Sequence, residues 1–221
     1  MPRTGLVIFD CDGVLVDSEL IGCRVEALAL SRLGLAITAE EILERFTGAT
    51  AAETFRTLEA EHGQPLPEDF VPQVKEAIRA AFTRELRAVA GVAAALDQIA
   101  LPMCVASSSD PARIEHSLRL VGLFERFAPH VFSASAVERG KPAPDLFLYA
   151  ARRMATPPRH CVVIEDSSRG AQAGVAAGMR VLGFAGGSHC RPGHDERLRA
   201  AGAERVFANM SQLPGLIAGA E

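Results

Sequence analysis

The chain has 221 residues, 48% of them hydrophobic, which is enough for one sizeable core and a smaller appended unit. A formal net charge of −4 without a polybasic stretch argues against nucleic acid and membrane surfaces as partners, and no apolar run approaches the about 20 residues of a membrane span. Five cysteines without CxxC spacing predict buried thiols, with no disulfide and no structural zinc, in a monomeric cytoplasmic protein.

Short runs rich in β-branched residues alternate with helical patterns along most of the chain. These runs are residues 5–9, 102–107, 130–134, 161–165, 180–184 and 205–208. Such alternation predicts a parallel sheet with helices on both faces. We therefore expect an α/β fold with a Rossmann-like parallel sheet as its core.

The long stretch between the first two runs contains no comparable strand pattern. Its "TAEE" at residues 38–41 is typical of a capping box that opens a helix. We infer a helical cap domain inserted after the first strand, with its two connections close together. The expected boundaries are a core domain at 1–17 and 90–221 and a cap domain at 18–89.

Polar residues follow four of the predicted elements. In an open parallel sheet, ligands bind beyond the carboxyl ends of the strands, so these residues are expected to meet there. Lys141 stands out because it is one of only two lysines in the chain. The set consists of Asp10 and Asp12 after the first run, Ser107 and Ser108 after the second, Lys141 in "RGKPAPD", and Glu165 and Asp166 after "CVVI".

The composition of this set favours phosphoryl transfer. Asp10 and Asp12 are separated by one residue, so their side chains point the same way on an extended chain. A carboxylate that attacks a phosphoryl group meets a like-charge repulsion of about 4 kcal/mol per pair at 4 Å and an effective dielectric of 20. Mg²⁺ between Asp10 and Asp166, with Lys141 beside the phosphate, would offset that repulsion. The chemistry expected is attack by Asp10 to form an aspartyl-phosphate.

Four ordered motifs resemble those of the haloacid dehalogenase superfamily of phosphohydrolases. They are "DCDGVLVDSE", "VASSS", the lysine of "GKPAPD" and "VIEDSSRGAQAGVAAGM". The resemblance covers essentially the whole chain and implies a phosphoric monoester hydrolase that uses Mg²⁺. Its substrate would be a small phosphorylated molecule, a sugar or sugar-acid phosphate such as 6-phosphogluconate.

The resemblance also implies a role for each residue of the set. Asp10 would be the nucleophile and Asp12 the general acid and base, with the backbone carbonyl of Asp12 on the metal. Ser107, Ser108 and Lys141 would bind phosphate. The implied metal ligands are Asp10, Asp12, Asp166 and, directly or through water, Glu165.

Alternatives with similar core motifs remain open at this point. A receiver-type phosphorylation switch also gathers acids, a hydroxyl and a lysine around Mg²⁺, although the long insertion and Asp12 argue against it. A β-phosphoglucomutase-like sugar phosphomutase shares the aspartyl-phosphate. Where that mutase carries a cap histidine and a cap arginine, this chain has Gly22 and Ala51, which cannot bind phosphate through a side chain. A phosphatase is therefore preferred.

The helical cap is expected to select the substrate. Arg24 and Arg45 are the cap arginines nearest to the motifs, and each could meet a sugar-acid carboxylate by charge-assisted hydrogen bonds.

Two further motifs are interpreted as structural. Gly170, Gly174 and Gly178 recur every four residues, which suits close packing of a helix on the sheet. "SHCRPGHD" gathers His189, Cys190, His194 and Asp195, a set that could bind a transition metal, but its Pro-Gly pair favours an exposed loop.

Overall fold

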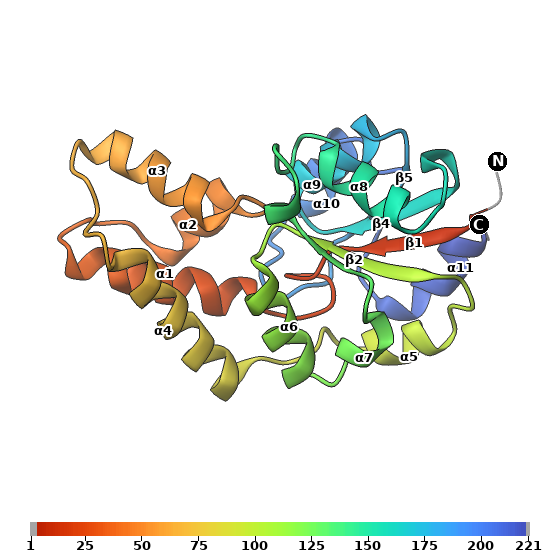
Figure 1. Cartoon of the computed structure of the whole chain (residues 1–221), viewed down its shortest axis with the longest axis horizontal. Coiled ribbons are helices and arrows are strands. Elements are labelled where there is room, and N and C mark those ends of the chain that lie inside the picture. Colours follow the sequence, from red (N-terminus) through yellow and green to blue (C-terminus); the bar gives the residue numbers. More distant parts are fainter. Residues whose placement is uncertain (1–3, 220–221) are drawn as a thin grey trace.

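The computed structural model describes residues 4–219 and contains a six-stranded parallel sheet in the order β3-β2-β1-β4-β5-β6 (Figure 1). The strands are β1 (Leu6–Phe9), β2 (Met103–Ser107), β3 (Val131–Ser133), β4 (Cys161–Glu165), β5 (Arg180–Phe184) and β6 (Arg205–Phe207). Each lies within one residue of its predicted bounds. The expectation of an α/β fold built on a parallel sheet is confirmed.

The sheet is buried on both faces, which explains why its strands are apolar without a polar alternation. On β1, Val7 and Phe9 join one hydrophobic layer, and Leu6 and Ile8 join the other. The first layer includes side chains of α5 (Val92–Asp97), α6 (Pro111–Leu120), α7 (Phe124–Phe127) and α11 (Leu213–Ala218). The second includes α8 (Asp145–Arg153), α9 (Ser168–Ala176) and α10 (His194–Ala200).

Four helices that follow β1 in the chain and precede β2 lie together beside the sheet, and we call them the helical unit (Figure 1). They are α1 (Glu19–Arg32), α2 (Ala39–Phe46), α3 (Ala51–His62) and α4 (Phe70–Glu85). Thr38 caps α2 as the sequence predicts, because its hydroxyl accepts from the Glu41 amide at 3.1 Å and the Glu41 carboxylate accepts from the Thr38 amide at 2.7 Å.

The chain enters and leaves this helical unit through two adjacent segments. The Asp17 amide donates to the Arg87 carbonyl at 2.9 Å, and the Val89 amide donates to the Leu15 carbonyl at 3.0 Å. This pairing meets the geometric requirement of an inserted unit. The division into core and cap domains at 17/18 and 89/90 remains a prediction.

Within residues 4–219, no helix combines the length and apolarity needed to cross a membrane. All five cysteines are free thiols, and Cys104 and Cys161 are buried in the sheet as expected.

Candidate active site

The turn after β1 places Asp10 and Asp12 at the carboxyl end of the sheet. The Asp10 amide donates to the Ile164 carbonyl of β4 at 3.0 Å, and both aspartates are buried. Gly13 has a φ of 79°, and a Cβ at this position would lie 1.9 Å from Oδ2 of Asp166. Glycine is therefore needed for the turn to pass this close to Asp166.

Lys141 lies in the loop before α8 and is buried between two carboxylates. Its Nζ is 2.6 Å from Oδ1 of Asp10, 2.5 Å from Oε1 of Glu165 and 3.1 Å from the Ala106 carbonyl. Burial alone would lower the pKa of Lys141, but the two carboxylates outweigh it and raise that pKa above its usual value. For Asp10, burial has the opposite effect and raises the pKa, and the positive charge of Lys141 opposes this rise. The amine is thus a fixed positive charge beside Asp10.

Asp12 is held by three side chains. The Ser18 hydroxyl and the Arg113 guanidinium donate to Oδ1 at 2.6 and 3.0 Å, and the Ser109 hydroxyl donates to Oδ2 at 2.6 Å. Burial works against ionisation, but Arg113 and the two hydroxyls outweigh it and lower the pKa of Asp12. Ser18, Ser109 and Arg113 had no role assigned from the sequence, although Ser18 lies in "DCDGVLVDSE" and Ser109 closes the "SSS" run after β2.

The two expected phosphate-binding serines follow β2. Ser107 is 1% exposed, and its hydroxyl accepts a hydrogen bond from the Ser109 amide at 3.1 Å. The Ser108 hydroxyl donates to the Gly48 carbonyl at 3.0 Å. Because Gly48 belongs to the loop before α3, Ser108 links the sheet to the helical unit.

Glu165 and Asp166 lie at the end of β4 and have different surroundings. Oε2 of Glu165 accepts from the amide and hydroxyl of Ser167 at 3.1 and 2.9 Å, while Oε1 faces Lys141. Oδ2 of Asp166 is buried without a well-aligned hydrogen-bond donor, although Nε2 of His189 lies 2.8 Å away. Asp166 therefore has a lone pair available for another ligand.

Three of the expected metal ligands fit a hard divalent cation. One carboxylate oxygen from each of Asp10, Glu165 and Asp166 lies within 4.8 Å of the others, and all three residues are buried. Buried carboxylates need compensating positive charge, and oxygen-only donor sets suit Mg²⁺. Asp166 can also offer a lone pair to such an ion while it stays beside His189.

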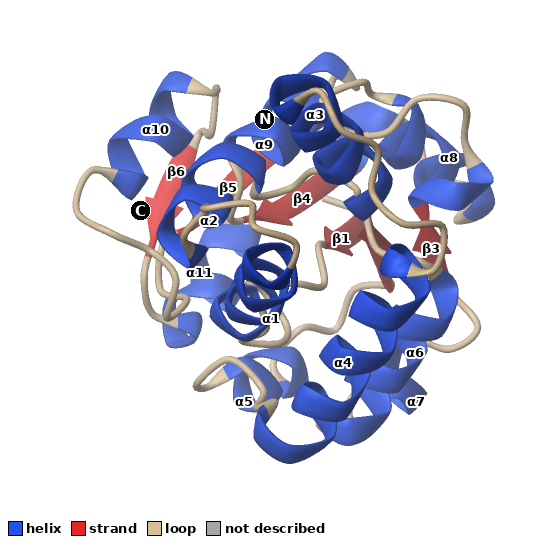
Figure 2. Ribbon diagram, turned by 90° about the vertical axis from the view of Figure 1, so that its left-hand side faces the viewer, coloured by secondary structure: helices blue, strands red, loops and turns tan. Residues whose placement is uncertain are grey.

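A cavity of about 1120 Å³ lies between the helical unit and the carboxyl end of the sheet. In Figure 2, which looks from the side of the helical unit, α1 to α4 lie in front of the strands. Asp10, Asp12, Ser107, Ser108 and Lys141 line its floor, with Asp166 beside them. Helices α3 and α4 contribute three basic side chains, Arg56, Lys75 and Arg79.

The expected cap arginines are not part of this cavity. Arg24 pairs with Glu85 at 2.5 Å, and Arg45 pairs with Glu61 at 2.5 Å, all on the exposed surface of the helical unit. Neither residue lines the cavity. A role of Arg24 and Arg45 in binding substrate stays a prediction, and their ion pairs with Glu85 and Glu61 do not support it.

The loop containing His189 and Cys190 also differs from its interpretation as an exposed turn. His189 is 2% exposed and faces Asp166, and Cys190 is only partly exposed. Burial alone would lower the pKa of His189, but Asp166 outweighs it and raises that pKa to about 11. Arg191 and Pro192 are exposed as expected, whereas His189 points inward. The hydrophobic periodicity of the sequence could not predict the contact between His189 and Asp166.

Two of the three spaced glycines provide the predicted close packing. A Cβ on Gly174 would lie 2.6 Å from Val181 of β5, and a Cβ on Gly170 would lie 1.9 Å from the Glu165 carboxylate. Gly178 has no neighbour within 4 Å and adopts a φ of 71° after the end of α9. Its role is to end the helix, so the packing interpretation was wrong for Gly178.

We expect Gly170→Ala to lower the free energy of unfolding by about 1–3 kcal/mol, because the new methyl group must displace Glu165 from Lys141. The rate of phosphate release should fall with it. Gly22→Ala in α1 is the matched control, since its Cβ would find its nearest atom 3.8 Å away and helix propensity favours alanine by about 0.5–1 kcal/mol. Denaturant unfolding measures the stability of the two variants. Equal free energies of unfolding would contradict the packing argument.

The chain belongs to the haloacid dehalogenase-like hydrolases, whose family model matches residues 4–178. A relative with a known activity is the 6-phosphogluconate phosphatase of Escherichia coli K12, 34% identical over 217 residues that cover 98% of this chain and 96% of that enzyme. The expectation of a phosphoric monoester hydrolase of this superfamily is confirmed.

Two solved structures are similar over nearly the full length. A conserved haloacid dehalogenase-like protein of unknown function from Agrobacterium tumefaciens has a TM-score of 0.84 and 41% identity, with 98% of each chain covered. A family hydrolase from Deinococcus radiodurans, solved with bound phosphate and sodium, has a TM-score of 0.78 and 34% identity, covering 99% of this chain and 97% of its own.

Proposed function

We propose that the protein is a Mg²⁺-dependent phosphatase that hydrolyses sugar or sugar-acid phosphates through an aspartyl-phosphate on Asp10. The observation that carries this proposal is the buried contact between Asp10 and Lys141 at the floor of the cavity. A fixed amine beside a carboxylate allows a phosphate dianion to approach that carboxylate. We expect a small phosphorylated molecule as the only partner of a cytoplasmic monomer.

The first step is attack by Asp10 on phosphorus. Lys141 holds Oδ1, so we assign the attack to Oδ2. A bond forms between Oδ2 and phosphorus as the ester bond breaks, and the electron pair leaves on the alcohol oxygen. Asp12 in its protonated form gives that oxygen its proton.

The second step returns the enzyme to its starting state. Water attacks phosphorus, Asp12 accepts the proton of that water, and the bond from phosphorus to Asp10 breaks to regenerate the carboxylate. The contacts of Arg113, Ser18 and Ser109 hold Asp12 in the ionised form that this step requires. The first step requires the protonated form, so Arg113 has to move away from Asp12 when substrate enters.

Phosphate and metal have separate ligand groups. Ser107 and Ser108 would donate hydroxyl hydrogen bonds to phosphoryl oxygens, and Lys141 would contribute its charge. Asp10, Asp166, the backbone carbonyl of Asp12 and, directly or through water, Glu165 would hold Mg²⁺. When bound, this ion supplies further positive charge to the reacting phosphoryl group.

The relative from Escherichia coli makes 6-phosphogluconate the first substrate to test. Its carboxylate requires a basic partner away from the phosphate. Arg56 and Arg79 line the cavity and form no ion pair among residues 4–219. We therefore propose these two arginines in place of Arg24 and Arg45.

We expect Arg56→Ala and Arg79→Ala each to raise the KM for 6-phosphogluconate about tenfold or more, the effect of losing one charge-assisted hydrogen bond. The KM for glucose 6-phosphate, which has no carboxylate, should change little. Arg24→Ala and Arg45→Ala are matched controls outside the cavity. If the controls raised KM as much as the cavity variants did, the assignment would be wrong.

A sugar phosphomutase can be distinguished from a phosphatase by the product that it forms. Gly22 and Ala51 both line the cavity and provide no phosphate-binding side chain there. We expect β-glucose 1-phosphate with a trace of the 1,6-bisphosphate to yield inorganic phosphate and no isomer. Accumulation of glucose 6-phosphate without phosphate release would reverse the assignment, because a sugar hydroxyl would then be the acceptor.

A further inference from the structure

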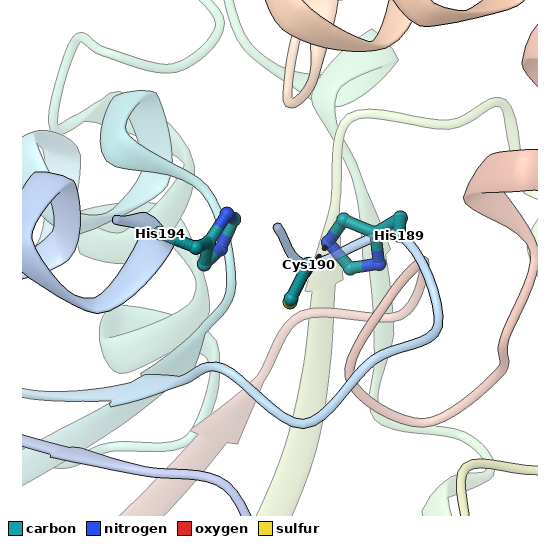
Figure 3. A group of neighbouring side chains, drawn as sticks. All are labelled: His189, Cys190 and His194. Atoms are coloured by element: carbon teal, nitrogen blue, oxygen red, sulfur yellow. Dashed lines mark hydrogen bonds between the residues drawn. The ribbon is translucent and has the colours of Figure 1, made fainter. Parts of the chain in front are cut away.

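The loop after β5 and the first residue of α10 bring together two imidazoles and a thiol outside the cavity (Figure 3). One donor atom from each of His189, Cys190 and His194 lies within 4.8 Å of the others. Figure 3 shows Cys190 between the two rings. None of the three lines the cavity, although His189 and His194 both contact Asp166.

The backbone holds this cluster in place before any ligand arrives. The amide and hydroxyl of Ser188 donate to Oδ1 of Asp17 at 3.0 and 2.8 Å, which ties the loop to the segment after β1. The Cys190 amide donates to the Gly187 carbonyl at 3.0 Å. A Cβ on Gly187 would lie 2.6 Å from the His189 ring, so the loop packs directly on that ring. The backbone is therefore preorganised, although His189 and His194 would have to exchange their present contacts with the Asp166 carboxylate and Arg197 for the ion.

The distances within the cluster suit a tetrahedral metal ion. Sγ of Cys190 lies 3.6 Å from Nε2 of His189. Ligand bonds of about 2.3 Å to sulfur and 2.0 Å to nitrogen at tetrahedral angles give a separation of about 3.5 Å. Nε2 of His194 lies 2.6 Å from the Asp166 carbonyl, the kind of contact that orients ligating histidines. The spacing from His189 to His194, with four residues between, also falls in the range of zinc ligands.

One side of the cluster is closed and the other is open to solvent. The side chain of His189 is 1% exposed. Cys190 and His194 are partly exposed, which gives an ion a route from solvent.

We propose that His189, Cys190 and His194 form a second metal site that binds a thiolate-preferring divalent ion such as Zn²⁺. Imidazole and thiolate ligands select such ions over Mg²⁺, whereas the oxygen ligands at Asp10 and Asp166 do the opposite. The two sites meet at Asp166, since Nε2 of His189 lies 2.8 Å from its Oδ2. The ion would replace the protons on the imidazole nitrogens and on the thiol. Its own positive charge would then lie beside Asp166.

Cobalt titration tests this site independently of activity. The full chain in saturating Mg²⁺ is titrated with Co²⁺, and the thiolate-to-cobalt absorption and tetrahedral visible bands are recorded. We expect both to saturate at one equivalent and to disappear when Zn²⁺ is added. Cys190→Ala should abolish the thiolate band, and His194→Ala should weaken cobalt binding about tenfold or more.

Matched variants separate this site from the proposed phosphatase centre. Cys23→Ala removes another buried thiol and should leave the cobalt spectrum unchanged. Asp10→Asn should leave it unchanged as well, even if that variant is inactive. A wild-type spectrum with only weak octahedral bands, or a thiolate band that survives in Cys190→Ala, would overturn the proposal. Circular dichroism melting of each variant verifies that the fold is retained.

Discussion

Replacing Asp10 by asparagine should lower the rate of phosphate release by about 10⁴-fold or more, because an amide oxygen cannot form the aspartyl-phosphate. Asp10 is buried and its Oδ1 contacts Lys141, a contact that the asparagine carbonyl can keep. The protein should therefore remain folded and still bind phosphate. Initial rates of phosphate release with 6-phosphogluconate, alongside thermal melting, measure the two effects.

Asp97→Asn is the matched control, since this carboxylate lies on the surface and pairs with Arg126 at 2.7 Å. It should retain the wild-type rate. A second readout is the covalent intermediate, which should be trapped on wild type by acid quenching and be absent from Asp10→Asn. An active Asp10→Asn variant would exclude Asp10 as the nucleophile.

Replacing Lys141 by methionine should impair stability and activity together. Two buried carboxylates, Asp10 and Glu165, would lose the cation between them, and breaking such a buried pair costs about 3–5 kcal/mol. The rate of phosphate release should fall by about 10²-fold or more, since a fixed charge beside the phosphate is lost. Urea unfolding and initial rates measure these changes.

The loss of stability should depend on pH. Burial already raises the pKa of Asp10, and Lys141 is the group that opposes this rise. Without Lys141 that pKa rises further above its value in the unfolded chain. Such a group favours the folded state when protonated, so Lys141→Met should recover stability relative to wild type as pH falls. A stability difference that is constant with pH would argue against an uncompensated carboxylate.

Two further variants separate the contributions of Lys141. Lys141→Met with Glu165→Gln removes one of the unpaired charges and should regain part of the stability without regaining activity. Lys75→Met removes the other lysine, whose contact with Asp110 is exposed, and should change stability by no more than about 0.5 kcal/mol. If the double variant were as unstable as the single one, the buried charge would not be the cause.

The core of the site was predictable because chain order and chemistry coincide there. Asp10, Ser107 and Asp166 each follow directly on an apolar strand run, and parallel strands end at the same edge of a sheet. Once the runs are recognised as parallel strands, these residues must meet. Lys141 lies further beyond its strand run, 130–134, than the other members lie beyond theirs, and its rarity and the family resemblance drew attention to it.

The sequence by itself therefore determined the parallel sheet, the inserted helices and the set of acids, serines and lysine at one edge, because strand periodicity and strand ends are local properties. Tertiary structure alone decided which long side chains reach the cavity. Arg113 contacts Asp12 across 101 positions of sequence, whereas Arg24 turns to Glu85 on the surface. It also decided that His189 is buried against Asp166. Such contacts depend on how helices and loops are oriented in space, and residue order carries no signal for that orientation.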